Sequence, residues 1–171
     1  MSEPDQASIP WRLVFAMCVA QILAMIGFAS FPALLPTFIS EWRLTNTEAG
    51  WVSGLYFAGY MGAVPILVGL TDRIDPRAIF VFSAALSALA SIGFALFADG
   101  LWSAAVLRAL AGAGLAGTYM PGLKVLSDRF QGPKQSRAVS YYTSSFSVGA
   151  GVSFILAGEF GAWLGWRWAF A

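Results

Sequence analysis

The chain has 171 residues, of which 58% are hydrophobic and only 11% charged, with a net charge of +1 and a mean hydropathy of +0.69. A soluble domain carries about 25% charged residues, so this composition excludes an ordinary water-soluble fold. Histidine is absent and cysteine occurs once, at Cys18, which excludes a disulfide framework, a thiolate metal site and serine–histidine catalysis.

Apolar runs organise the chain from its first residues to its last, and each is long enough to cross a bilayer, which takes about 20 residues. We therefore predict an all-α, polytopic membrane bundle with five spans and the start of a sixth. The predicted spans cover about 13–38, 50–70, 78–98, 101–123 and 139–164, the sixth starts at 166–171, and residues 1–12 form a cytoplasmic tail. Pro32 and Pro36 predict a bend or an end late in the first span.

Polar turns separate these runs. Thr45 followed by Glu48 predicts a capping box ahead of the second span. Asp75 before Pro76 predicts a tight turn, and Gly100 predicts a helix stop. A longer polar loop is expected over residues 124–137.

Basic residues are unequally divided between the two sets of loops. One side carries Arg12, Arg73, Arg77, Lys124, Arg129, Lys134 and Arg137, and the other carries Arg43 and Arg167. Positive charge favours the cytoplasmic side, so we predict a multi-pass protein of the cell (inner) membrane with a cytoplasmic N-terminus. Most of the tryptophans fall near predicted span ends and are interpreted as interfacial anchors.

Small residues recur at every fourth position in three spans. The stripes are Gly50, Gly54, Ala58 and Gly62; Ser83, Ser87 and Ser91; and Ser145, Gly149, Ser153, Ala157 and Gly161. At 3.6 residues per turn each set lies on one helix face and allows close approach of a second helix. Packing seams and faces along which helices slide need the same residues, so both interpretations stay open.

Arg108 is the candidate with the clearest physical rationale. A cation inside a span costs at least about 2.5 kcal/mol unless it faces a cavity or a partner. Tyr119 lies about three turns further on and nearly on the same face, with Gly112 between them, so the two side chains are expected to line a polar cavity. The alternative is that Arg108 extends to the extracytoplasmic end of its span.

Further polar residues in the spans are weaker candidates for the same cavity. They are Gln21, Tyr56, Tyr60, Tyr141 and Ser144, and each has an alternative role in packing or interhelical hydrogen bonding. Glu159 lies near the end of the fifth span, either as an interfacial residue or as a protonatable carboxylate.

Taken together, these features resemble the major facilitator superfamily. The residues that carry the resemblance are the charged turn with Asp72, Arg73 and Arg77, the fourth-span group Arg108, Gly112 and Gly114, and the segment Gly165, Trp166, Arg167, Trp168, Ala169 and Phe170. The chain departs from the family's turn pattern at Val68, Asp75 and Ala78, and its fifth span lacks the Gly-Pro pair of drug antiporters.

The resemblance implies a transporter of two six-helix bundles with the substrate bound between them at mid-membrane. Asp72, Arg73 and Arg77 would then latch the cytoplasmic side, with Asp128 as a partner for Arg77. Arg108 would act in substrate binding or proton coupling.

The function expected is therefore secondary active transport of a small solute by alternating access, and not an enzymatic reaction. Arg108 favours an anionic or polar solute, and the possible coupling ion is H⁺ or Na⁺. No cofactor, metal or nucleic acid is expected as a partner. The partners expected are the lipid bilayer and a missing C-terminal half, because the chain reads as an incomplete N-terminal fragment. The alternative is a non-transporting scaffold or receptor of the same fold.

Overall fold

The computed structural model describes residues 11–171, and this part of the chain is helical, without strands. The first predicted span corresponds to three pieces, α1 (Trp11–Ala24), α2 (Ser30–Ala33) and α3 (Leu35–Glu41). The later elements are α4 (Asn46–Leu70), α5 (Pro76–Phe97), α6 (Leu101–Arg129), α7 (Pro133–Leu164) and the 3-10 helix η1 (Trp166–Ala169). The predicted tail lies outside the described residues, except for its last two, which begin α1.

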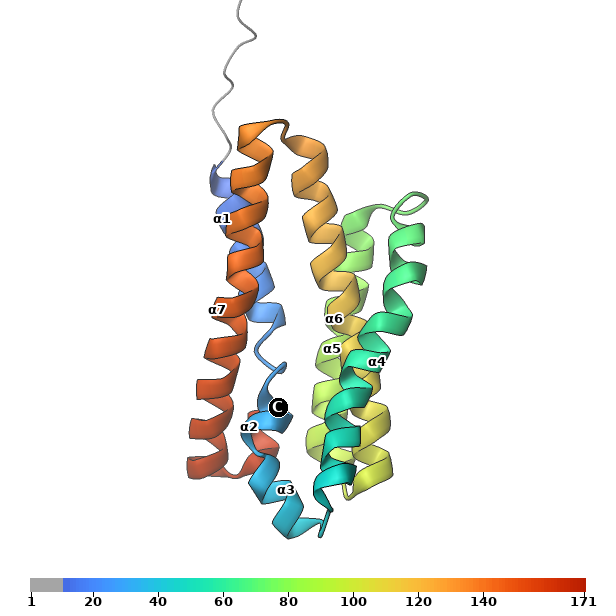
Figure 1. Cartoon of the computed structure of the whole chain (residues 1–171), viewed down its shortest axis with the longest axis vertical. Helices are drawn as coiled ribbons and strands as arrows, with labels where there is room; N and C mark the ends of the chain where they lie inside the picture. Colours follow the sequence, from blue (N-terminus) through green and yellow to red (C-terminus); the bar gives the residue numbers. More distant parts are fainter. Residues whose placement is uncertain (1–10) are drawn as a thin grey trace, which may run out of the picture.

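The long helices run side by side along the long axis of the molecule (Figure 1). α6 packs along both α4 and α5, and α7 packs along α1 and the broken segment that follows it. Four helices within residues 11–171, α4 to α7, are long and apolar enough to cross a membrane. The chain is thus a polytopic membrane protein, as its composition predicted.

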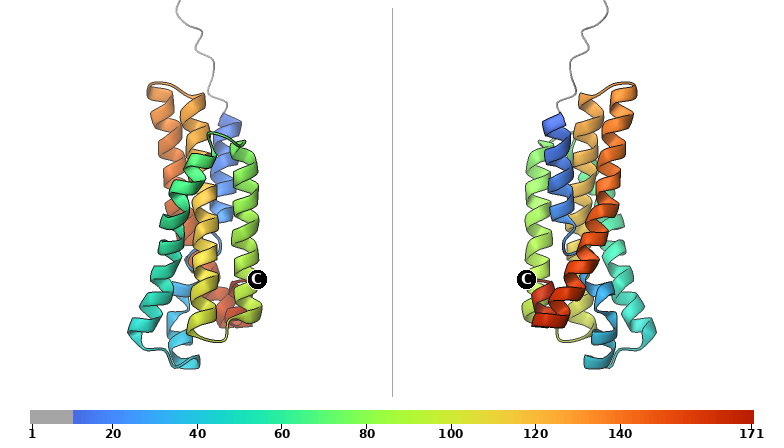
Figure 2. Two further views of the ribbon diagram at one scale, coloured as in Figure 1. Left: turned by 90° about the vertical axis from the view of Figure 1, so that its right-hand side faces the viewer. Right: turned by 90° about the vertical axis from the view of Figure 1, so that its left-hand side faces the viewer.

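The start of α1, the α4–α5 turn and the α6–α7 turn lie at one end of the bundle, and the α3–α4 and α5–α6 turns lie at the other (Figures 1 and 2). The seven basic residues predicted to share one side belong to the first set of turns and the helix ends beside them. The geometry therefore separates the basic residues as the alternation of spans requires.

Local signals in the sequence place several helix ends. Thr45 caps α4 in a full capping box with Glu48, with a distance of 2.8 Å from the Thr45 amide nitrogen to a Glu48 carboxylate oxygen. Asp75 caps α5 by accepting a hydrogen bond from the Arg77 amide at 2.8 Å. Both caps confirm the predicted turns.

The α6–α7 connection corrects the sequence prediction. Residues 124–137 were expected to form a polar loop, but α6 continues to Arg129 and α7 already begins at Pro133. Polar side chains stop a hydrophobic run without stopping a helix, and here the two helices extend beyond the apolar region at the basic end of the bundle.

The first span is broken in two places. α1 ends at Ala24 and α2 starts at Ser30, and a second break at Leu34 separates α2 from α3 between Pro32 and Pro36, as the prolines predicted. Proline is well tolerated in the first turn of a helix, where its missing amide has no partner to lose. The break at residues 25–29 instead depends on contacts from other helices.

Small residues set the closest helix contacts. A Cβ added at Gly112 in α6 would overlap the backbone carbonyl of Tyr56, and one at Gly59 in α4 would overlap that of Ala109. Ser83 and Ser87 lie against Gly114 in the same way, at 2.7–2.8 Å from its built Cβ. The stripe of the third predicted span therefore lies at a close helix contact.

The second-span stripe behaves differently. Gly50, Gly54 and Gly62 have no atom within 4 Å of a built Cβ, and the face that they share is exposed. The glycine of α4 that makes the close contact is Gly59, which lies off this stripe. Sequence periodicity identified the stripe, but only the fold shows that its glycines have no neighbour among residues 11–171.

An aromatic core closes the end of the bundle away from the basic residues. Phe31 and Phe38 stack with their ring centroids 4.9 Å apart, and Phe94 stacks on Phe170 at 4.1 Å. Trp166 is buried against these rings and its indole nitrogen donates a hydrogen bond of 2.9 Å to Glu41. Most other tryptophans are exposed, as interfacial anchors would be, so Trp166 is the exception.

Candidate functional site

The broken first span lies at the centre of the candidate site. In lipid, backbone N–H and C=O groups outside a helix must find partners within the protein. Two side chains from other helices supply them. Arg108 of α6 donates to the carbonyls of Gly27 at 3.4 Å and Phe28 at 3.1 Å, and Ser153 of α7 bonds the carbonyl of Ile26 and the amide of Ala29.

Arg108 is buried, with only 3% of its surface exposed. Its guanidinium carbon lies 4.1 Å from the centre of the Tyr56 ring and 5.8 Å from that of Phe31. Such cation–π contacts are strongest where water is excluded. The side chain therefore faces the bundle interior rather than extending to the end of its span, and no carboxylate within residues 11–171 forms an ion pair with it.

One nitrogen of this guanidinium has no hydrogen-bond partner within residues 11–171. The Nε atom of Arg108 is buried and has no hydrogen-bond partner among the described residues. A buried donor without an acceptor is unfavourable by about 1–3 kcal/mol, and more for a charged group. The site therefore holds a cation whose hydrogen-bonding capacity is only partly met by carbonyls.

A cavity of about 280 Å³ opens on the other side of Tyr56. It is enclosed by helices α4, α6 and α7 and by the break in the first span. The lining residues are Phe28, Tyr56, Phe57, Tyr60, Leu115, Tyr119, Thr143, Phe146 and Ser147. Six of these nine side chains are aromatic, so the cavity offers ring faces with a few hydroxyl groups between them.

Phe28 is the central ring of this wall. Its centroid lies 5.6 Å from that of Tyr56, 6.1 Å from Phe57 and 5.8 Å from Phe146, each in an edge-to-face arrangement. Edge-to-face pairs at these distances are favourable because the ring edge is positive and the face negative. The broken segment thus contributes a side chain that joins α4 to α7.

The structure divides the predicted site residues into groups. Three of the predicted candidates, Tyr56, Tyr60 and Tyr119, line the aromatic cavity. Arg108 lies behind Tyr56 and does not line the cavity itself, so the expected shared surface with Tyr119 is absent. Gly112 leaves no open space between them, because the backbone of α4 fills it.

Tyr141 and Ser144 lie elsewhere. They line a separate groove of about 630 Å³ between α1 and α7, together with Trp11, Phe15 and Cys18. The ring of Tyr141 is 56% exposed and stands edge-on to Trp11 at 5.7 Å. These two residues are therefore apart from the aromatic cavity, on the outer face of the same helices.

Gln21 is fully buried and belongs to a hydrogen-bonded cluster that sequence reasoning did not find. Its Oε1 atom accepts from the Tyr142 hydroxyl at 2.9 Å, while its Nε2 atom has no partner within the described residues. Tyr142 stacks on Tyr119, with ring centroids 5.6 Å apart. The hydroxyl-rich run that starts at Ser140 signalled this region, but not which of its two tyrosines points inward.

Phe28 and Ser153 were also missed as site residues. Ser153 was placed only on a small-residue stripe, and Phe28 only within an apolar run. Neither residue type signals a site by itself, because their roles depend on where the first span breaks.

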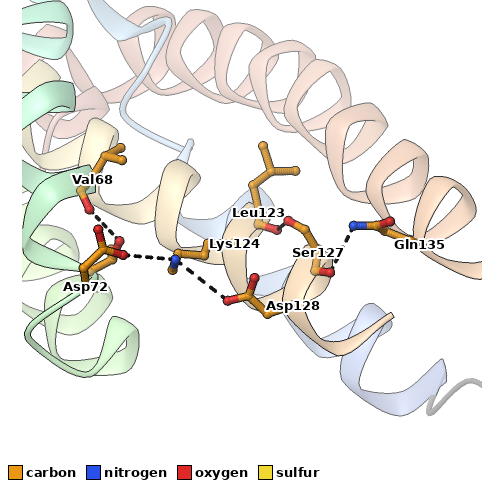
Figure 3. A network of polar contacts seen from close by, with 8 residues as sticks. Val68, Asp72, Leu123, Lys124, Ser127, Asp128 and Gln135 are labelled. Carbon is orange, nitrogen blue, oxygen red and sulfur yellow. Dashed lines mark hydrogen bonds and ion pairs between the residues drawn. The ribbon is translucent and has the colours of Figure 1, made fainter. Parts of the chain in front are cut away.

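Charged residues at the basic end of the bundle form a network around Lys124 (Figure 3). Its Nζ atom lies 3.2 Å from a carboxylate oxygen of Asp72, in the α4–α5 turn, and 4.0 Å from one of Asp128, one helical turn away in α6. The predicted pairing of Asp128 with Arg77 is not observed. Instead, Lys124 lies between the carboxylates of Asp72 and Asp128 (Figure 3). Arg73 is exposed in the same turn, and Arg77 is exposed in the first turn of α5.

A polar contact also joins α6 and α7 at the basic end of the bundle. The side-chain amide of Gln135 in α7 donates to the Ser127 carbonyl in α6 at 3.0 Å (Figure 3).

Glu159, at the opposite end of α7, is exposed and accepts a hydrogen bond from Trp163 at 3.1 Å. This position matches the interfacial interpretation of Glu159.

Known proteins of one family resemble this chain over most of its length. The model of the Major Facilitator Superfamily matches residues 17–171. The chain is 28% identical over 130 residues to "Probable sphingolipid transporter spinster homolog 1" of Arabidopsis thaliana, covering 76% of this chain and 26% of that protein.

Two bacterial relatives extend the comparison. An uncharacterised MFS-type transporter of Mycobacterium tuberculosis is 27% identical over 164 residues, covering 94% of this chain and 28% of that protein. The niacin transporter NiaP of Acinetobacter baylyi is 26% identical over 141 residues, covering 80% of this chain and 31% of that protein. The chain thus spans between about a quarter and a third of the length of these relatives. Because the family model matches residues 17–171, which is most of the chain, the chain belongs to the Major Facilitator Superfamily.

Proposed function

We propose that this chain is the N-terminal bundle of a secondary active transporter, which moves a small anionic or polar solute across the cell (inner) membrane by alternating access. The observation that carries the proposal is the aromatic cavity with Arg108 directly behind Tyr56. Rings bind an apolar body, and the partly unpartnered cation supplies a long-range attraction for a negative group.

The open faces of the bundle support a second bundle as partner. The exposed stripe of α4 is made of small residues, which allow helices of another unit to approach closely. In this proposal the C-terminal half closes the cavity, and Asp72, Arg73, Arg77 and Asp128 hold the cytoplasmic side shut together with Lys124. The N-terminus of the chain is cytoplasmic.

The names of the relatives suggest the chemistry to test. One is named a niacin transporter and another a sphingolipid transporter, and each name describes a molecule with an apolar part and a polar or charged group. An aromatic carboxylate combines the two features that the cavity offers. Nicotinate is therefore the first probe, and nicotinamide is its uncharged counterpart of nearly equal shape.

The test uses the full-length protein reconstituted in proteoliposomes. We expect radiolabelled nicotinate to accumulate under an imposed inward H⁺ or Na⁺ gradient, nicotinamide to accumulate far less, and Arg108→Gln to abolish the difference. Running the two gradients separately identifies the coupling ion. A preference for nicotinamide would refute the anionic solute.

The alternative is a scaffold or receptor of the same fold. It predicts no flux of any solute in a wider panel of organic anions, cations and neutral solutes, under either gradient. Flux of any one of these solutes would exclude it.

A further inference from the structure

A single hydroxyl group bridges the break in the first span. Ser153 of α7 is fully buried, donates to the carbonyl of Ile26 at 2.5 Å and accepts from the amide of Ala29 at 2.9 Å. These two backbone groups lie on either side of Gly27 and Phe28. Because a hydroxyl both donates and accepts, it satisfies one carbonyl and one amide that lie outside the helices.

The packing of α7 on α1 explains how so short a side chain reaches the break. Gly149 lies one turn before Ser153, and a Cβ built on it would be 3.0 Å from the Cβ of Met25 and 3.3 Å from the Cα of Ile22. The glycine therefore lets the backbones of α1 and α7 approach closely. Alanine at position 153 would bond neither group.

The bridged segment carries the central ring of the candidate cavity. Phe28 precedes Ala29, whose amide Ser153 holds, and its ring contacts Tyr56 of α4 and Phe146 of α7. Arg108 holds the carbonyls of Gly27 and Phe28 from the opposite side. The ring is thus fixed by its own backbone, which is held from α6 and α7 together.

We propose that Ser153 is a positioning residue of the cavity: its hydroxyl holds the ends of the non-helical segment and so sets the place of the Phe28 ring. The consequence for transport rests on the proposed function, whereas the consequence for the segment does not. Ser153 touches no solute in this arrangement and acts through the backbone of the first span.

The chain contains a matched control for this proposal. Ser145 lies two turns earlier on the same face of α7 and is also buried, but its hydroxyl donates to the carbonyl of Tyr142 in its own helix at 2.6 Å. Ser145→Ala therefore removes a buried hydroxyl from the same helix without touching the break. Ser153→Thr keeps a hydroxyl at position 153 and is the rescue variant.

The first experiment measures hydrogen–deuterium exchange of the full-length protein in detergent, with peptides that cover residues 25–30. Loss of one hydrogen bond predicts about fivefold faster exchange at the Ala29 amide in Ser153→Ala. Exchange in Ser145→Ala and Ser153→Thr is expected to stay close to that of the parent protein. Equal exchange in Ser153→Ala and the parent would overturn the proposal.

A second measurement follows the accessibility of position 28. In a background from which every native cysteine, Cys18 included, has been removed, Phe28→Cys is labelled with N-ethylmaleimide, and the labelling rate is compared with Ser153 present and with Ser153→Ala. We expect faster labelling when the hydroxyl is missing, since the segment then moves. An unchanged rate would count against the proposal even if exchange increased.

The transport measurement separates positioning from general stability. For nicotinate uptake, Ser153→Ala is expected to raise KM several-fold with Vmax per folded protein nearly unchanged, whereas a purely structural defect lowers the amount of folded protein and leaves KM unchanged. A lowered Vmax with unchanged KM would overturn the positioning role. If the parent protein moves no solute, the proposed function fails, and the exchange and labelling results still decide whether Ser153 holds the segment.

Discussion

Arg108 of α6 lies with its guanidinium 4.1 Å from the ring centre of Tyr56 in α4, while its N–H groups bond carbonyls of the first span. From α6, the Arg108 side chain thus contacts both α4 and the break in the first span. Tyr56 in turn forms part of the wall of the aromatic cavity. The buried charge and the cavity are therefore coupled through a single ring.

The shape of the Arg108 side chain, and not only its charge, is expected to matter. A lysine keeps the charge but cannot stack a planar group on Tyr56 and reach two carbonyls together. We expect Arg108→Lys to lower nicotinate uptake about tenfold or more. Arg167→Lys, at the exposed Arg167 of η1, is the matched control and should leave uptake nearly unchanged. Parent-like uptake by Arg108→Lys would show that charge alone suffices.

Gly112 is predicted to be intolerant of even one added methyl group. A Cβ there overlaps the carbonyl of Tyr56, so α4 and α6 must separate, at about 1–3 kcal/mol. The thermal midpoint of Gly112→Ala in detergent should fall accordingly. Gly151→Ala is the control, because a Cβ at Gly151 meets nothing within 4 Å, and its midpoint should stay the same or rise. Equal midpoints for both variants would contradict the close crossing.

Gln21 and Tyr142 are expected to be energetically coupled. Each of Gln21→Leu and Tyr142→Phe removes their buried hydrogen bond, which should lower the unfolding free energy by about 1 kcal/mol. Tyr142→Phe leaves the Gln21 side-chain carbonyl without its donor, whereas in Gln21→Leu the Tyr142 hydroxyl can still donate to the Thr118 carbonyl at 3.3 Å. The double variant should lose less than the sum, by about 0.5–2 kcal/mol. Unfolding of all four proteins in detergent provides the cycle, and strict additivity would mean that the bond contributes nothing.

Asp72 and Asp128 carry the same charge on either side of Lys124, but their geometry differs. The Asp72 contact at 3.2 Å joins the α4–α5 turn to α6, while the Asp128 contact at 4.0 Å stays within one helix. We expect Asp72→Asn to reduce the initial rate of uptake more than Asp128→Asn does. Both contacts are exposed, so neither substitution should change stability by more than about 1 kcal/mol. A larger effect of Asp128→Asn on uptake would contradict the expectation that the contact to the α4–α5 turn matters more than the contact within α6.

The membrane orientation predicts opposite labelling of two turns. The experiment uses the full-length protein with every native cysteine removed, Cys18 included. Asp99→Cys in the α5–α6 turn and Gln131→Cys in the α6–α7 turn are then introduced, both at exposed positions. In intact cells a membrane-impermeant maleimide should label only the first, and both after permeabilisation. The reverse pattern would place the basic end of the bundle outside.

Sequence alone determined those features that depend on neighbouring residues or on summed composition. The apolar runs fixed the four long helices, because a backbone in lipid must satisfy its hydrogen bonds locally. The Thr45 and Asp75 caps followed from side chains two or three residues from their partners. The division of basic residues between two ends followed from the alternation of spans.

Only the tertiary structure decided how the site is built. The break at residues 25–29 depends on Arg108 and Ser153, which lie about 80 and 125 residues further along the chain. Likewise, the fold alone shows that Tyr56 separates Arg108 from the cavity and that Tyr142, not Tyr141, meets Gln21. A helix pattern gives the spacing of side chains on one cylinder. Which face meets which neighbour is set by packing between helices, where a single glycine or serine determines how closely two backbones approach.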